Sequence, residues 1–303
     1  MSGKLRLYKE KLEGYKKFYS IVKTIKMVTM AKFRVAQARV KTRDFTLRYT
    51  EKAFSNPSFD EAASTGNVVY VAVTTNRGSC GALNSNTYKY LEPVVTGKST
   101  ASIIPIGKKG QDSISKLFPQ AFKFSIINDM KNPMNFAYAT YVWENASTLS
   151  ENTDRIQLFY HRFVSAGAQR AAVYNIPSYA KWLESLGDAA STDNQKSRYL
   201  FANALMNEEE EFIRDYYDFH ASLATLNAVC ENELSEQAAR LMAVEGQLTN
   251  IMQLQTRTSN LYNKTRQSSI TASLIEVLSA MSSLEGSTTK GVQRTNFWEG
   301  AKL

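Results

Sequence analysis

The C-terminal segment from about Ser197 to Glu285 constrains the fold more than any other part of the chain. It contains no proline, and its only glycine is Gly246, although these residues are spread along the rest of the sequence. Because proline and glycine interrupt helices, so long a run without them predicts one long helix, residues 197–285. At about 1.5 Å per residue it reaches on the order of 130 Å, wider than any globular core. Such a helix needs a partner along its length.

Apolar and small residues in this segment recur at steps of three and four. The predicted seam consists of Leu234, Ala238, Leu241, Val244, Leu248, Ile251, Leu254, Thr258, Leu261 and Thr265. A repeat close to 3.5 residues keeps one stripe facing a partner in a left-handed coiled coil. The pattern favours one half of a two-helix shaft, and a solvated helix in a bundle is the alternative.

Residues 1–57 supply the natural partner. Tyr15 to Asn56 contains no glycine or proline, and Pro57 ends the helix. Its predicted apolar face is Tyr15, Phe18, Val22, Ile25, Val28, Ala31, Val35 and Ala38. Helices at opposite ends of a chain pair antiparallel when the domain between them returns the chain to its start. We therefore expect a long antiparallel two-helix coiled coil formed by the N- and C-terminal helices.

Residues 67–178 alternate between strand and helix patterns. Strands are predicted at 67–75, 102–106, 122–127, 155–164 and 170–176, and helices at about 82–90, 111–117 and 135–149. This alternation predicts a central Rossmann-like α/β domain with a hairpin at one edge. Residues 178–196 are expected to form a polar connection, the run Glu208–Glu211 to lie on the long helix, and residues 286–303 to form a tail.

The positive charge lies almost entirely in the N-terminal segment. Residues 1–52 hold 15 Lys and Arg against 4 Asp and Glu, while the whole chain has a net charge of +9. A basic helix fits nucleic acid, an anionic membrane surface, an acidic protein or an import signal. An RNA- or DNA-binding arm is therefore one alternative function. Aromatic residues interleaved for base stacking would strengthen it, but here they fall at seam spacing.

Motifs for catalysis or ligand binding are weak. The loops 78–81 and 107–110 follow strands, but neither has the spacing of a phosphate-binding loop. A nucleotide-binding enzyme with a helical clamp is thus a second alternative, which the missing glycine fingerprint disfavours. His161 and His220 are too few for a metal cluster, and Cys80 and Cys230 match no metal or redox spacing. We expect no catalytic, cofactor or metal site.

Four stretches share a further resemblance, in order along nearly the whole chain. They are residues 25–37 (IKMVTMAKFRVAQ), 74–84 (TTNRGSCGALN), 231–243 (ENELSEQAARLMA) and 262–271 (YNKTRQSSIT). Together they resemble the gamma-subunit family of F-type ATP synthases, whose members form the central rotor shaft. Departures from the family pattern include Ile25 for Met, Asn76 for Asp, Ser273 for Glu and Ala280-Met281 for Gly-Ala. They indicate a divergent lineage.

The resemblance implies the partners. The paired helices would sit inside a ring of three alpha and three beta subunits, and the α/β domain would dock on the small delta and epsilon stalk subunits and the membrane c-ring. The chain would bind no nucleotide, cofactor or nucleic acid. Rotation of the asymmetric shaft would couple proton flow to ATP synthesis or hydrolysis at the beta subunits.

The resemblance also implies contact residues. Arg266, Gln267 and Thr271 match family positions that contact the beta subunits, and Lys26 and Met27 would lie beside them on the facing helix. Arg34 is expected to meet acidic loops of the beta subunits. The divergent signature and long tail favour the matrix side of the mitochondrial inner membrane, with the cytoplasmic side of a bacterial membrane as the alternative.

Overall fold

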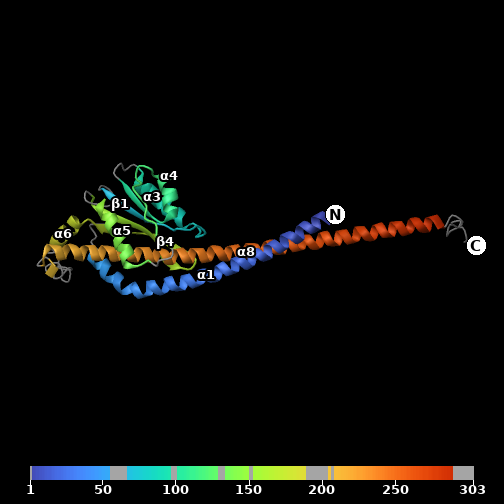
Figure 1. Cartoon of the computed structure of the whole chain (residues 1–303), viewed down its shortest axis with the longest axis horizontal. Helices are drawn as coiled ribbons and strands as arrows, with labels where there is room; N and C mark the ends of the chain where they lie inside the picture. Colours follow the sequence, from blue (N-terminus) through green and yellow to red (C-terminus); the bar gives the residue numbers. More distant parts are fainter. Residues whose placement is uncertain are drawn as a thin grey trace, which may run out of the picture. The chain divides into compact units, whose positions relative to one another are not determined.

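The computed structural model describes residues 2–54, 67–96, 101–128, 134–149, 153–188, 204–205 and 208–288. The chain divides into two compact units, one of Met1–Lys23 with Gln247–Leu303 and one of Thr24–Gly246. Two long helices, α1 (Ser2–Phe54) and α8 (Glu210–Thr288), contribute to both (Figure 1). We call the Thr24–Gly246 part the larger unit and the other the smaller unit. Among the described helices, none combines the length and hydropathy needed to span a bilayer.

The larger unit is built on a four-stranded mixed sheet. The strands β1 (Val68–Val73), β2 (Ser102–Ile106), β3 (Arg155–Ser165) and β4 (Ala168–Pro177) lie in the order β2-β1-β3-β4. β1 pairs in parallel with β2 and β3, whereas β3 and β4 form an antiparallel hairpin at the edge. Val71 lies opposite Ile104 on one side and Leu158 on the other. The predicted α/β sheet with an edge hairpin is confirmed.

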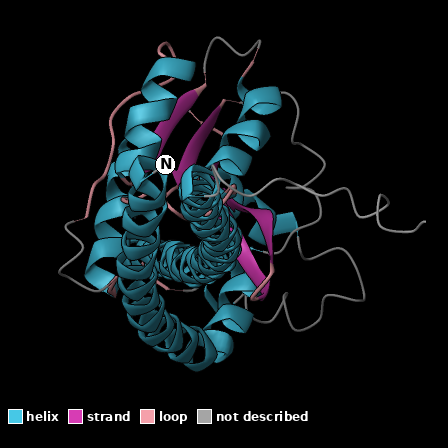
Figure 2. Cartoon of the chain, turned by 90° about the vertical axis from the view of Figure 1, so that its right-hand side faces the viewer, coloured by secondary structure: helices cyan, strands magenta, loops and turns pink. Residues whose placement is uncertain are grey.

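Helices cover both faces of this sheet (Figure 2). On β1, Val68, Tyr70 and Ala72 belong to a core with α3 (Leu83–Val95) and α4 (Lys108–Leu117). The alternate residues, which include Val69 and Val71, belong to a second core with α5 (Phe136–Thr148), α6 (Tyr179–Asp188) and α8. Because successive strand side chains point to opposite faces, β1 builds two cores at once.

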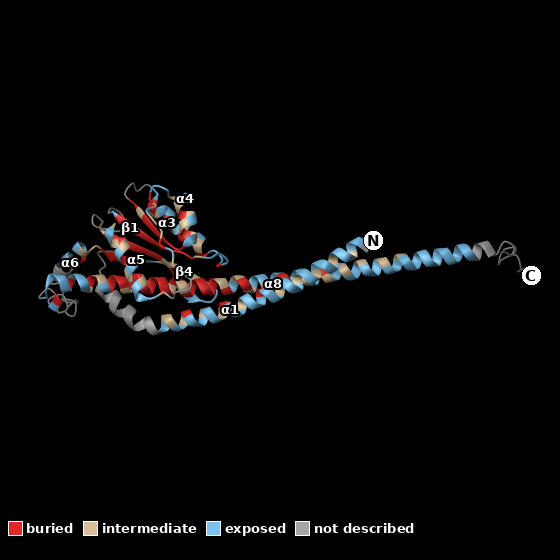
Figure 3. Ribbon diagram, viewed as in Figure 1, coloured by how far each residue is buried: buried red, intermediate tan, exposed pale blue. Residues whose placement is uncertain are grey.

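The first part of α8 is a core helix, not a solvated one. Its buried residues on the sheet side recur at helical spacing, as Ile213, Tyr217, Ala221, Ala224 and Ala228. Tyr217 also donates a hydrogen bond of 2.6 Å from its hydroxyl to the carbonyl of Pro177. From about residue 242 the helix becomes mostly exposed (Figure 3). One continuous helix therefore has two different environments.

In the smaller unit, the inward residues of each helix follow a heptad pattern. On α1 they are Leu5, Tyr8, Leu12, Tyr15, Tyr19 and Val22, and on α8 they are Ile251, Gln255, Thr258, Tyr262, Thr265, Ser269 and Ala272. Steps of three and four that alternate average 3.5, the repeat of a coiled coil. The predicted paired-helix seam is therefore present here, with tyrosines among the inward residues of α1 and mostly small or polar residues on α8.

Several predicted seam positions are wrong. Leu254 and Leu261 of α8 are exposed, as are most predicted residues of α1, namely Phe18, Ile25, Val28, Ala31, Val35 and Ala38. Tyr15 and Val22 do face inward. The prediction favoured the most apolar stripe of α1, whereas the inward stripe includes three tyrosines, Tyr8, Tyr15 and Tyr19, whose rings are amphipathic.

Other boundaries also differ from expectation. The polar connection contains α6, whose Trp182 is buried, and α8 begins at Glu210, after Glu208 and Glu209. Residues 122–127 make only two isolated bridges, Ile103 with Phe122 and Ile106 with Ile126, instead of a regular strand. The helix also continues to Thr288, three residues into the predicted tail. The predicted helical residues 197–203 and the tail from 289 onward lie outside the described residues.

Candidate functional site

The six predicted contact residues fall into two groups. Lys26, Met27 and Arg34 lie on α1 in the larger unit, whereas Arg266, Gln267 and Thr271 lie on α8 in the smaller unit. Five of the six side chains are exposed, and Met27 is 68% exposed. A large apolar side chain in water is typical of a surface that a partner covers.

Lys26 differs from the other five residues because it already has a partner. Its Nζ lies 2.8 Å from Oε1 of Glu245 on α8, within the larger unit. Thr271 also makes a local bond, since its hydroxyl donates to the carbonyl of Gln267 at 3.0 Å. Met27, Arg34, Arg266 and Gln267 present their side chains to solvent.

The smaller unit exposes a further set of apolar side chains that the sequence analysis missed. Between residues 270 and 284 of α8, seven large apolar residues are about half exposed or more: Ile270, Leu274, Ile275, Val277, Leu278, Met281 and Leu284. Five of them, Ile270, Leu274, Val277, Met281 and Leu284, follow one another at steps of four and three and so lie on one stripe, with Leu278 beside it and Ile275 further round the helix. An exposed apolar stripe on a helix is typical of a face that a partner covers. The absence of charge between Arg266 and Glu276 was the available sequence signal.

The T-T-N-R-G-S-C-G-A-L-N stretch is a fold element. Asn84 donates from Nδ2 to Thr75 Oγ1 at 2.8 Å, and its Oδ1 accepts from the Thr75 backbone N at 3.1 Å. The Cys80 thiol is buried against Asn84 Nδ2 at 3.4 Å. Ser79 and Gly81 both have φ near +60°, the left-handed conformation that a tight turn requires. These bonds hold the turn between β1 and α3.

The position where an α/β fold commonly binds phosphate is occupied by the chain itself. The backbone N–H groups at the start of α4 donate to β1-end residues: Lys108 N to Asn76 Oδ1, Lys109 N to Thr75 O and Gly110 N to Thr74 Oγ1. These distances are 2.9–3.0 Å. A phosphate needs such groups free at a helix N-terminus. Any phosphate would therefore have to displace these bonds.

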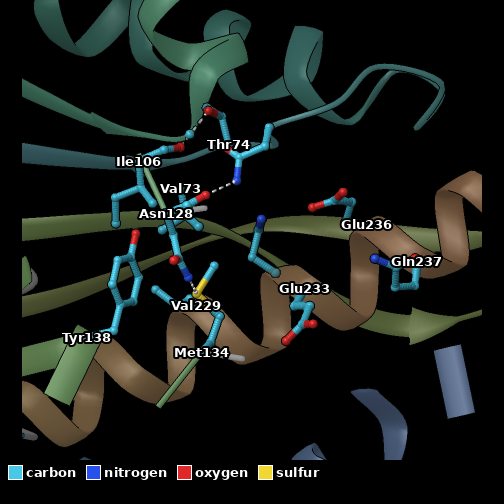
Figure 4. A pocket seen from close by; sticks show the side chains of 13 residues that line it. Val73, Thr74, Ile106, Asn128, Met134, Tyr138, Val229, Glu233, Glu236 and Gln237 are labelled. Carbon is cyan, nitrogen blue, oxygen red and sulfur yellow. Dashed lines mark hydrogen bonds between the residues drawn. The ribbon is translucent and has the colours of Figure 1, made fainter. Parts of the chain in front are cut away.

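A cavity of about 70 Å³ lies at the carboxyl ends of β1 and β2, against α8 (Figure 4). Tyr138 and Glu236 line opposite sides of it. Burial raises the pKa of Tyr138 to about 12, and its hydroxyl has no hydrogen-bond partner among the described residues. Burial also raises the pKa of Glu236, against the opposing effect of Arg240, which pairs with it.

Comparison with known proteins gives consistent matches over nearly the whole chain. A family model described as ATP synthase matches residues 4–284. A relative named ATP synthase subunit gamma, mitochondrial, from Trypanosoma brucei brucei is 68% identical, and the alignment covers 99% of each chain. A relative with the same name from Arabidopsis thaliana is 26% identical, with 92% of this chain and 85% of the relative covered.

Solved structures agree in fold. A chain of the Euglena gracilis mitochondrial ATP synthase, in a structure of OSCP, F1 and the c-ring, has a TM-score of 0.84 at 41% identity. It covers 98% of this chain and 100% of its own. A chain of the Euglena gracilis rotor has a TM-score of 0.79 at 43% identity, covering 89% and 100%. The fold class predicted from the sequence is thus confirmed.

Proposed function

Because this chain belongs to the ATP synthase gamma family, we propose that it is the central-stalk rotor subunit of a mitochondrial F-type ATP synthase. In this role it turns inside a ring of three alpha and three beta subunits on the matrix side of the inner membrane. Its α/β domain docks on the delta and epsilon subunits and on the c-ring. Rotation then couples proton flow to ATP synthesis or hydrolysis at the beta subunits.

The observation that carries this proposal is the exposed apolar end of α8. Seven large apolar side chains between residues 270 and 284 are exposed, and most of them lie on one stripe of the helix. Exposing them costs free energy of about 25 cal/mol per Å² of apolar surface. Ring subunits that contact this side of the helix would bury the stripe.

The exposed contact residues supply polar interactions with that ring. We infer that Arg266, Gln267 and Thr271 contact the beta subunits, and that Met27 and Arg34 meet them from α1. Arg34 carries the fixed charge that acidic loops would recognise. Coupling through a rigid asymmetric helix gives each beta subunit a different conformation, because each one meets a different side of it.

The chain supplies shape and stiffness, and the beta subunits supply the chemistry. One feature supports a non-catalytic role for this chain. The α4 N–H groups that could bind phosphate are already bonded to Asn76, Thr75 and Thr74. Isolated chain is therefore expected to bind and hydrolyse no ATP.

Native mass spectrometry of the complex purified from its source tests the proposal. We expect one copy of this chain with three copies each of two larger subunits, and ATPase activity in that complex only. A chain that purifies alone, or with nucleic acid whose binding weakens steeply with salt, would overturn the proposal in favour of a basic nucleic-acid arm.

A further inference from the structure

Two ion pairs join α1 to α8 within the larger unit. Lys26 Nζ lies 2.8 Å from Glu245 Oε1, and Arg39 Nη1 lies 3.1 Å and 3.5 Å from the two carboxylate oxygens of Glu233. All four side chains are 28–41% exposed. Along α1 the numbering rises from the first pair to the second, whereas along α8 it falls. The two pairs thus hold antiparallel helix segments at two separate heights.

Between these two heights, the fully buried side chains of α1 are small. They are Thr29 and Ala36, and the larger, half-buried Phe33 packs against Phe163 of β3, with 5.8 Å between the ring centroids. The Thr29 hydroxyl bonds to the carbonyl of Ile25 in its own helix, at 2.9 Å, and so makes no bond across the interface. Small side chains form shallow knobs, and a shift of one helix along the other then loses little packing.

We propose that Lys26–Glu245 and Arg39–Glu233 are register-setting pairs whose four side chains are positioning residues for torque transmission. A slip of one helical turn moves a side chain by about 5.4 Å, which separates both pairs at once. Charged groups at a helix–helix interface are known to fix register and partner choice in this way. This inference rests on the proposed rotor function, because only a loaded shaft needs its two helices locked against sliding.

The inference assigns Lys26 a place inside the rotor, in contrast to a direct contact with a beta subunit. It also explains why the neighbouring residues matter. Met27 and Arg34 are exposed on the same helix, so a slide of α1 would move both relative to the ring. Register therefore controls where the contact residues of α1 meet the beta subunits.

Charge reversal and charge exchange in the intact complex test the inference. The variants are Lys26→Glu, Glu245→Lys and the exchange that combines them, assayed in membrane vesicles for the ratio of ATP-driven proton transport to ATP hydrolysis. A half-exposed ion pair shifts an equilibrium by up to about five-fold, so each single reversal is expected to lower the ratio by about two- to five-fold. The exchange restores the pair with opposite polarity, and we expect it to return the ratio close to that of the unaltered complex.

Lys23→Glu is the matched control, since Lys23 is exposed and lies one turn before Lys26 on α1. It makes the same charge change and is expected to leave the ratio nearly unchanged.

Loss of coupling in Lys26→Glu without recovery in the exchange variant would overturn the inference and favour a beta-subunit contact. Unchanged coupling in both single reversals would overturn it too. If a single reversal prevents assembly, recovery of assembly in the exchange variant supports the inference and continued failure contradicts it. The proposed function is tested separately with the unaltered complex. If this chain is not the rotor, ATP-driven proton transport by that complex will not depend on its presence.

Discussion

Gly110 lies where α4 approaches the end of β1. A Cβ atom there would lie 2.5 Å from Thr74 Oγ1 and 2.8 Å from Pro105 Cβ. Thr74 Oγ1 cannot move freely, because it accepts from Gly110 N and donates to Ile106 O. We therefore expect Gly110→Ala to lower the free energy of unfolding by about 1–3 kcal/mol, measured by urea denaturation.

Gly246 is the matched control at the residue scale. It lies inside α8, and a Cβ there would meet no atom within 4 Å. Alanine loses less backbone entropy than glycine in a helix, so Gly246→Ala is expected to raise the free energy of unfolding by about 0.5–1 kcal/mol. A destabilising Gly246→Ala, or a neutral Gly110→Ala, would contradict the packing described at these two sites.

His161 should make stability depend on pH. The side chain is buried, and burial lowers its pKa below the usual 6.5, against the opposing effect of Asn232. The unfolded chain therefore binds a proton at a higher pH than the folded chain does. The contribution of neutral His161 to the free energy of unfolding is therefore complete above about pH 6.5. It is lost as the pH falls below that value, by up to about 1.4 kcal/mol per pH unit.

Denaturation of the chain and of His161→Gln between pH 7.5 and 5.5 measures this effect. The variant should lose less stability on acidification, because it lacks the titrating group. The pKa of His220 is also lowered by burial, and that histidine is present in both proteins. Burial raises the pKa of Glu236, so its protonation on acidification has the opposite effect on the free energy of unfolding. Glu236 is also present in both the unaltered chain and the variant. If the free energy of unfolding changes with pH in the same way in the chain and in the variant, His161 is not the source of the pH dependence.

At the scale of elements, α6 packs on the first part of α8 through Tyr179 and Trp182. Trp182 is buried, and its ring centroid lies 5.3 Å from that of Tyr217 and 6.4 Å from that of Phe54. Removal of a buried indole is expected to cost about 3–5 kcal/mol, so Trp182→Ala should unfold at much lower urea concentration. Glu184→Ala, on the exposed side of α6, should change stability by less than about 0.5 kcal/mol. Equal effects of the two would contradict this packing.

The sequence predicted best the elements that have the same surroundings along their whole length. β2 is predicted at its observed residues, because a short β-branched and apolar run between turns has one stable placement. α6 was missed because its helix is short and contains Gly187, so polarity and turn residues outweighed the buried Trp182. The inward stripe of α1 was mispredicted because its exposed stripe is the more apolar one. An apolar stripe shows that something covers a helix but does not identify what covers it.

For the candidate site, too, the sequence identified exposed residues but did not identify what each residue contacts. Family motifs correctly identified four exposed residues, Met27, Arg34, Arg266 and Gln267. A motif identifies such residues by their positions in the sequence. No motif revealed that Lys26 pairs with Glu245, since a contact between residues far apart in sequence depends on the register of the two helices. The apolar end of α8 escaped prediction for a different reason: the predicted seam stops at Thr265, before the exposed stripe begins at Ile270.

At the scale of the whole molecule, the exposed apolar end should matter for assembly and hardly at all for the fold of the chain. We expect Leu274→Gln with Leu278→Gln to change the stability of the isolated chain by less than about 0.5 kcal/mol, because both side chains are exposed. The same change should lower the yield of complex. Leu226→Gln is the contrasting variant, since Leu226 is buried and its replacement should destabilise the chain itself. A double variant that assembles at the normal yield would contradict burial of this stripe in the complex.

Rotation of this chain within its complex tests the central claim most directly. A probe attached at Lys116→Cys, an exposed position on α4, would be followed in single complexes held by their ring subunits. The rotor function predicts ATP-dependent turning in one direction with three pauses per turn, one for each beta subunit. A probe that stays fixed while the same complexes hydrolyse ATP at their full rate would contradict it.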